Sequence, residues 1–318
     1  MKPLYHFSHD DCAELDEGPV VQPVPVTRHR TLLIDGVEVF FREAGPAGAP
    51  ALLLLHGFPT SSHMFRNLIP LLADSYHVIA PDYPGFGHSG APDRSRFDYT
   101  FEHLADIVDK LTVSLGVAKY SMYVMDYGAP IGYRLALRHP ERIQALIVQN
   151  GNAYDEGLET PLWDPLKAYW ADGSQANREA LAGLVSREMT EFQYTNGMSD
   201  MARVSPDTWL IDQALLDRPG NREIQLDLFF DYRSNVALYP DFQAFFRRRK
   251  PPTLILWGKH DIVFPEAGAR PYLRDLPRAE LHILDTGHYA LEDKFAVMVP
   301  LIRDFLDRKL TDRQRPAA

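Results

Sequence analysis

The stretch that decides the fold is Ser121-Met-Tyr-Val-Met-Asp126-Tyr-Gly128-Ala-Pro-Ile-Gly132. Its apolar start predicts a buried strand, and the residues after Gly128 predict a helix. A side chain on such a sharp turn projects from a strained backbone and needs small neighbours, which Gly128 supplies. The residue at the turn is Asp126, and no G-x-S-x-G sequence occurs anywhere in the chain. The turn is therefore predicted to present a carboxylate and not a serine.

Other apolar runs predict the sheet around this turn. They are short, and most are followed by a helical stretch, which implies right-handed crossovers between parallel strands. The predicted strands are residues 51–55, 77–80, 121–125, 143–148, 253–257 and 281–284, and helical periodicity marks residues 101–115 and 295–305. Residues 31–42 alternate around Asp35-Gly36, which predicts a β-hairpin. We expect an α/β fold with a doubly wound, mostly parallel sheet.

One long segment interrupts the alternation of strands and helices. Residues 152–249 contain helical patterns, for example 161–170 and 178–188, without a convincing strand. We predict an inserted helical cap at 152–249, an N-terminal arm at 1–30, and a core formed by 31–151 and 250–318. Trp163, Trp170 and Trp209 fall in the cap, where they indicate either an apolar pocket or packing of the cap itself.

Composition excludes several classes of function. The 318 residues carry a net charge of −10, which opposes nucleic-acid binding, and the basic run 247–250 is interpreted as a solvated helix end. No apolar stretch is long enough to span a membrane, and the acidic first 30 residues lack the features of a signal peptide. The single cysteine, Cys12, has no partner for a disulfide. We expect a cytoplasmic protein without a membrane or nucleic-acid partner; a homodimer is left open.

Two further polar residues follow predicted strands. Asp261 comes just after the run 253–257, and His288 follows the last strand in Leu284-Asp-Thr-Gly-His. Functional groups of α/β sheets gather at the carboxyl ends of strands, so Asp261 is the candidate supporting acid and His288 the candidate base. His260 is the weaker alternative base, and Asp285 is expected to be structural.

Backbone donors are predicted beside the turn. Phe58 belongs to His56-Gly-Phe-Pro, which directly follows a predicted strand. The N–H groups of Phe58 and Tyr127 would form a two-donor oxyanion hole, with His56 in a structural role. The glycine-rich segment 82–89 is interpreted as a scaffold loop, because no basic residue or helix start adapts it to phosphate.

Together these motifs resemble the α/β-hydrolase superfamily, and within it the branch of epoxide hydrolases and haloalkane dehalogenases. H-G-F-P, D-Y-P-G-F-G-H-S, the aspartate turn, W-G-K-H-D and D-T-G-H occur in family order between residues 31 and 307. The resemblance implies that Asp126 attacks a saturated carbon and forms an alkyl-enzyme ester. His288, supported by Asp261, then activates water to hydrolyse that ester. It implies a small apolar organic substrate, water as co-substrate, and neither cofactor nor metal.

The activities of this branch differ in the leaving group and in the protein groups that stabilise it. Dehalogenases commonly bind halide with an asparagine after H-G and a tryptophan after the nucleophile, where this chain has Phe58 and Tyr127. Fluoroacetate dehalogenases place arginines at the positions of Tyr127 and Pro130. An epoxide oxygen instead needs a proton, which cap tyrosines supply. The sequence Asp-Tyr232-Arg-Ser-Asn resembles that of epoxide hydrolases, so Tyr232 is the predicted donor unless it only packs in its helix.

The second cap tyrosine that donates a proton to the epoxide oxygen is predicted to be Tyr169, with Tyr154 as the alternative. The favoured activity is an epoxide hydrolase that gives a diol. Haloalkane or haloacid dehalogenation is the alternative, and an esterase activity ranks last. A low-turnover ligand-binding homologue is a further alternative, although such a protein would not need both Asp261 and His288 at strand ends.

Overall fold

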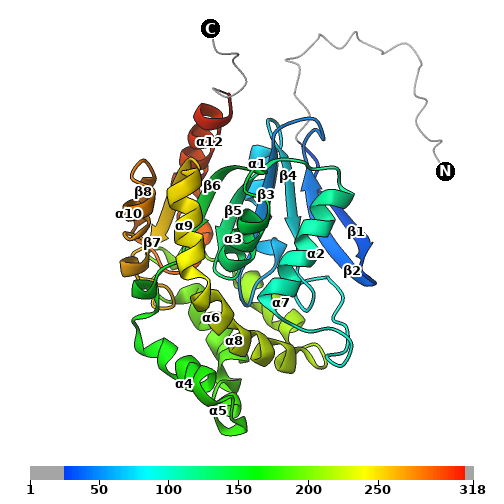
Figure 1. Cartoon of the computed structure of the whole chain (residues 1–318), viewed down its shortest axis with the longest axis vertical. Coiled ribbons are helices and arrows are strands. Elements are labelled where there is room, and N and C mark those ends of the chain that lie inside the picture. Colours follow the sequence, from blue (N-terminus) through cyan, green and yellow to red (C-terminus); the bar gives the residue numbers. More distant parts are fainter. Residues whose placement is uncertain (1–24, 312–318) are drawn as a thin grey trace, which may run out of the picture.

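The structure is a computed structural model that describes residues 25–311, and an eight-stranded sheet lies at its centre (Figure 1). The strand order is β1-β2-β4-β3-β5-β6-β7-β8. The strands are β1 (Arg28–Ile34), β2 (Val37–Ala44), β3 (Ala51–Leu55), β4 (His77–Pro81), β5 (Tyr120–Met125), β6 (Ile143–Gln149), β7 (Thr253–Gly258) and β8 (Glu280–Leu284). All pairs from β4 to β8 are parallel, whereas β2 pairs antiparallel with β1 and β4. The predicted α/β fold with a mostly parallel sheet is confirmed.

The first two strands form the predicted hairpin. Asp35 and Gly36 have φ values of 49° and 80°, as a two-residue turn of the favoured hairpin type requires. β1 begins at Arg28, within the segment 1–30 that was predicted to be an arm. Residues 1–24 of that arm, including Cys12, lie outside the described residues.

Helices cover both faces of the sheet. The helices are α1 (Leu68–Leu72), α2 (Phe101–Ser114), α3 (Gly128–Arg138), α4 (Asp164–Asp172), α5 (Gln175–Ala180), α6 (Arg187–Thr195), α7 (Pro206–Leu216), α8 (Asn221–Ala237), α9 (Tyr239–Arg249), α10 (Tyr272–Asp275), α11 (Ala290–Asp293) and α12 (Phe295–Thr311). Short 3-10 turns occupy Ser62–Phe65, Asp155–Leu158, Pro161–Trp163, Ala182–Val185, Met201–Arg203 and Glu266–Gly268. Figure 1 shows α2, α3 and α9 on one face of the sheet.

The alternation of side chains along the buried strands builds two apolar layers. In β3, Leu53 and Leu55 join the layer that contains α2, α3 and α9, and Leu52 and Leu54 join the layer that contains α1, α11 and α12. Fully burying a leucine side chain contributes about 1.5–3 kcal/mol to stability. Runs of apolar residues therefore place the strands firmly between the helix layers, with their carboxyl ends at one common edge.

Between β6 and β7 the structure has helices and turns only, and α4 to α8 gather beyond one edge of the sheet (Figure 1). The last helix of the predicted cap, α9, packs against α3 in the core layer. The helical stretch predicted at 178–188 is divided: α5 ends at Ala180, a 3-10 turn follows, and α6 begins after Ser186, whose hydroxyl accepts a hydrogen bond from the Met189 N–H. The domain bounds themselves stay predictions. No helix within residues 25–311 has the length and apolar composition needed to cross a membrane.

Candidate active site

Asp126 lies in the turn between β5 and α3, with a φ of 50° that L-residues rarely adopt. Two glycines make room for this turn. A Cβ on Gly128 would lie 2.1 Å from the carbonyl oxygen of Leu55, and a Cβ on Gly57 would lie 2.2 Å from the Cβ of Asp126. The need for Gly128 is visible in the sequence. The need for Gly57 is not, because Gly57 is 69 positions away in the chain and meets Asp126 only in the fold.

The two carboxylate oxygens of Asp126 have different surroundings. Oδ1 accepts hydrogen bonds from the backbone N–H groups of Phe58, at 2.7 Å, and Tyr127, at 2.6 Å. Oδ2 lies 3.6 Å from Nε2 of His288, which is too long for a hydrogen bond. Burial raises the pKa of Asp126 to about 6, although His288 and the two N–H groups oppose that rise. The carboxylate is therefore mostly ionised at neutral pH.

His288 is oriented by Asp261. Nδ1 of His288 lies 2.7 Å from Oδ2 of Asp261, and this contact assigns the proton to Nδ1. Nε2 is buried and has no hydrogen-bond partner among the described residues. Burial by itself would lower the pKa of His288, but the carboxylates of Asp261 and Asp126 outweigh it and raise that pKa. The structure thus brings together the predicted nucleophile, supporting acid, base and both backbone donors.

Asn150 is a member of the site that sequence reasoning missed. It directly follows β6, has a φ of 40°, and is fully buried. Its Nδ2 donates to Oδ2 of Asp261 at 2.7 Å, and its Oδ1 accepts from the Gly258 N–H at 3.0 Å. The Val263 N–H donates to the other oxygen of Asp261 at 2.7 Å. A signal was present, because Asn150 comes at the carboxyl end of a predicted strand.

A mostly apolar cavity of about 70 Å³ lies over Asp126. Phe58, Asp126, Tyr127 and His288 line it on the side of the core, and residues of the cap line the opposite side. Tyr232 of α8 is in its wall, and Tyr239 is among the groups that act on the Tyr232 hydroxyl. Burial raises the pKa of Tyr232 well above its ordinary value, so this phenol holds its proton.

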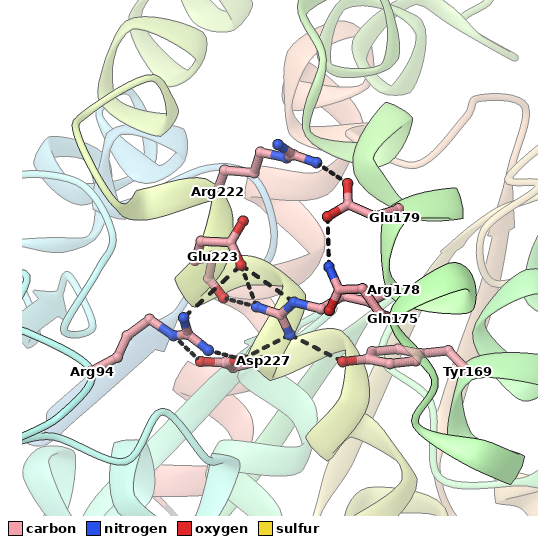
Figure 2. Close-up of polar contacts among 8 residues, drawn as sticks. All are labelled: Arg94, Tyr169, Gln175, Arg178, Glu179, Arg222, Glu223 and Asp227. Atoms are coloured by element: carbon pink, nitrogen blue, oxygen red, sulfur yellow. Dashed lines mark hydrogen bonds and ion pairs between the residues drawn. The ribbon is translucent and has the colours of Figure 1, made fainter.

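The other two predicted tyrosines lie elsewhere. The hydroxyl of Tyr169 accepts a hydrogen bond from Arg178 at 3.0 Å, within a network of ion pairs that also includes Glu223 and Asp227 (Figure 2). The hydroxyl of Tyr154 donates to Asp275 at 2.7 Å. Neither tyrosine is among the cavity residues of the described chain. Tyr169 is therefore not brought to the site, because charged groups of the cap hold its hydroxyl.

The residues interpreted as structural have local partners. His260 and Asp285 contact each other at 2.7 Å on the surface. The ring of His56 stacks on Tyr83, and burial lowers the pKa of His56 to about 4, so it is neutral. In the 82–89 loop, both carboxylate oxygens of Asp82 accept backbone N–H groups, which fits a scaffold role. Residues 25–311 contain no group of three or more metal-ligating side chains placed to hold an ion.

Comparisons with known proteins agree with this architecture. The uncharacterized hydrolase YNR064C of Saccharomyces cerevisiae is 46% identical over 267 residues, which cover 83% of this chain and 91% of that protein. A cis-3-alkyl-4-alkyloxetan-2-one decarboxylase of Shewanella oneidensis is 30% identical over 297 residues, covering 89% of each chain.

Solved structures show the same fold. An epoxide hydrolase from Vigna radiata has a TM-score of 0.71 at 23% identity, with 89% of this chain and 98% of that chain covered. A haloalkane dehalogenase variant from Bradyrhizobium elkanii has a TM-score of 0.72 at 23% identity, with 92% and 100% covered. The family described as alpha/beta hydrolase fold matches residues 50–295. The chain is therefore an enzyme of the α/β-hydrolase family.

Proposed function

We propose that this hydrolase opens epoxides to diols, with Asp126 as nucleophile, His288 as base and Asp261 as the acid that supports His288. The observation that carries the proposal is the unequal environment of the two Asp126 oxygens. Oδ1 is held by two backbone N–H groups, whereas Oδ2 faces the histidine beneath an apolar cavity. Oδ2 is thus placed to attack the substrate. Oδ1 then becomes the carbonyl oxygen of the ester, and the two N–H groups are already in position to stabilise its charge during hydrolysis.

In the first step, Oδ2 of Asp126 attacks a ring carbon of the epoxide. A bond forms between Oδ2 and carbon, the carbon–oxygen bond of the ring breaks, and the ring oxygen takes a proton from the Tyr232 hydroxyl. An ionised carboxylate needs no base for this attack, which fits the absence of a hydrogen bond between Asp126 and His288. Tyr232 is the only tyrosine of the proposed donor set that lines the described cavity.

In the second step, water attacks Cγ of the ester while Nε2 of His288 accepts a proton. The negative charge develops on Oδ1, where the N–H groups of Phe58 and Tyr127 already point. Removing one such donor typically costs about 2.7–4 kcal/mol of transition-state stabilisation. Collapse of the intermediate expels the diol, whose departing oxygen takes the proton from His288. Asp126 is left as a carboxylic acid, and its proton returns through solvent to the Tyr232 phenolate, which restores both groups.

A second candidate reaction is the opening of a four-membered lactone. The Shewanella oneidensis relative is named for oxetan-2-ones, which are rings of this kind. Attack by Asp126 on the saturated carbon of such a ring releases a carboxylate, which needs no proton. No cap tyrosine would then have to donate a proton, and the position of Tyr169 away from the cavity is compatible with this candidate.

Dehalogenation is the third candidate and has weaker support. The Nε1–H of Trp163, in the cavity wall, donates to the carbonyl oxygen of Val263 at 2.7 Å and is not free to bind a halide. No lysine or arginine lines the described cavity, so a haloacid would find no counter-charge there.

Intact-protein mass spectrometry of a His288→Ala variant tests the proposal. This variant should keep alkylation and lose ester hydrolysis, so it should gain the mass of an epoxide, an oxetan-2-one or an alkyl group from a haloalkane, with the label mapped to Asp126. The Asp126→Asn/His288→Ala double variant is the control, checked for deamidation by its mass. Labelling of that control, or no labelling of the single variant by any strained ring, would refute the proposal.

A further inference from the structure

One face of α6 contributes polar groups to the cavity. Met189, Phe192 and Gln193 line it at the spacing that places residues on one side of a helix, and Asn196, which follows the last residue of α6, lines it too. The side-chain amides of Gln193 and Asn196 have no hydrogen-bond partner within residues 25–311, although Gln193 is only 8% exposed. Gln193 is largely buried and Asn196 is partly exposed, and an amide that lines a cavity without a protein partner is available to bond a ligand.

The end of α6 is held against the loop that carries His288. The backbone at Asn196 lies so close that a Cβ on Gly287 would be 2.0 Å from the Asn196 carbonyl oxygen. The ring of Tyr194 stacks on Tyr289, with 3.9 Å between centroids and an interplanar angle of 8°. The end of α6 is therefore held beside the loop that carries His288, and Gln193, Asn196 and His288 line the same cavity.

We propose that Gln193 and Asn196 form a polar subsite that binds a neutral hydroxyl or carbonyl group of the substrate, a few atoms from the ring that Asp126 opens. The inference rests on the proposed function and changes its expected substrate from a hydrocarbon epoxide to an oxygen-bearing one. An amide offers both N–H donors and a carbonyl acceptor, which match such a group. The cavity contains Asp126 and Asp261 and no lysine or arginine, so an anionic substituent finds no fixed positive charge there.

The physical reason for selectivity is the cost of desolvation. A hydrocarbon that fills the cavity displaces the water bound to both amides and forms no hydrogen bond with them. A hydroxyl or carbonyl group forms hydrogen bonds that replace those made by the water. A buried polar group left without a partner weakens binding by about 10- to 100-fold. A site built to bond a hydroxyl accordingly discriminates against the analogue that lacks it.

The test compares two matched series of compounds in the His288→Ala background, where only adduct formation is observed. Each pair consists of an ω-hydroxy-1,2-epoxyalkane and the 1,2-epoxyalkane in which methyl replaces the hydroxyl, over a short range of chain lengths. We expect the rate of labelling of Asp126 to be at least about 10-fold higher for the hydroxylated member at one preferred length. Gln193→Met should lower that ratio about 10-fold.

Gln175→Met is the matched control, because Gln175 lies on α5 and its amide pairs with Glu179 outside the cavity (Figure 2). Asn196→Ala provides an independent test if Gln193→Met does not fold, as judged by thermal melting. An unchanged ratio in both cavity variants would overturn the subsite while leaving the proposed function intact. Failure of His288→Ala to label with either series, or with any strained ring, would instead reject the proposed function.

Discussion

Replacing Asn150 by glycine should move the pH dependence of ester hydrolysis and leave adduct formation almost unchanged. The Nδ2–H of Asn150 stabilises the Asp261 carboxylate through the oxygen that also binds His288. Without this donor the carboxylate holds the His288 proton more strongly, so the pKa of His288 rises further. Since only neutral His288 can accept a proton from water, hydrolysis should then require a higher pH.

The size of the shift follows from the lost contact. A hydrogen bond to a charged group contributes about 1.5–3 kcal/mol, and about 1.4 kcal/mol corresponds to one pH unit. With half of the lost energy acting on the His288 proton, the acid limb of the pH profile of hydrolysis moves up by about 0.5 to 1 unit. The Gly258 N–H also loses its acceptor, so we expect a loss of about 2–4 kcal/mol in the free energy of unfolding.

Glycine is chosen because Asn150 has a positive φ, which alanine would adopt only at a further cost of about 1–2 kcal/mol. Rapid-quench mass spectrometry across a pH series measures the rise and decay of the Asp126 adduct separately. Asn221→Gly, which removes a buried asparagine outside the site, is the matched control. An acid limb that stays in place, or an equal loss in both steps at all pH values, would refute the role assigned to Asn150.

Three other variants test separate parts of the structure. Tyr232→Phe should slow adduct formation from epoxides by about 100-fold or more, because the leaving alkoxide loses its acid, and should slow adduct formation from oxetan-2-ones much less; labelling rates in the His288→Ala background measure both. Gly57→Ala places a Cβ 2.2 Å from that of Asp126 and should slow adduct hydrolysis by about 100-fold or more, as single-turnover decay would show; near-normal decay in a folded variant would contradict the packing argument. Burial raises the pKa of Asp212 to about 7. Asp212 therefore favours its neutral form in the folded state, and the folded protein should lose up to about 4 kcal/mol as pH rises from about 4 to 7. Asp212→Asn should show less of that loss in melting curves taken over this range, and an identical pH slope would rule out the buried acid as its cause.

Much of the fold could be predicted from the sequence because its signals are local. Apolar runs identify the parallel strands, and Asp35-Gly36 identifies the hairpin turn. Asp126, Asp261 and His288 each follow a strand closely in the chain. Parallel strands place their carboxyl ends at one edge of the sheet, so three distant polar residues could be assigned to one site without knowledge of their contacts.

The direction of each side chain was decided by the tertiary structure. Tyr169 is a tyrosine in a cap helix, as expected of a proton donor. Its hydroxyl is nevertheless bound by Arg178, within an ion-pair network that forms only where α4, α5 and α8 pack together. Asn150 and Gln193 have no motif around them, and their roles arise from Asp261 and from a cavity wall that are distant in sequence. The sequence by itself determined the sheet, the turn at Asp126 and the order of the polar residues, since these depend on neighbours along the chain. The groups that orient His288 and meet the substrate depend on contacts between segments, and the folded packing alone selects them.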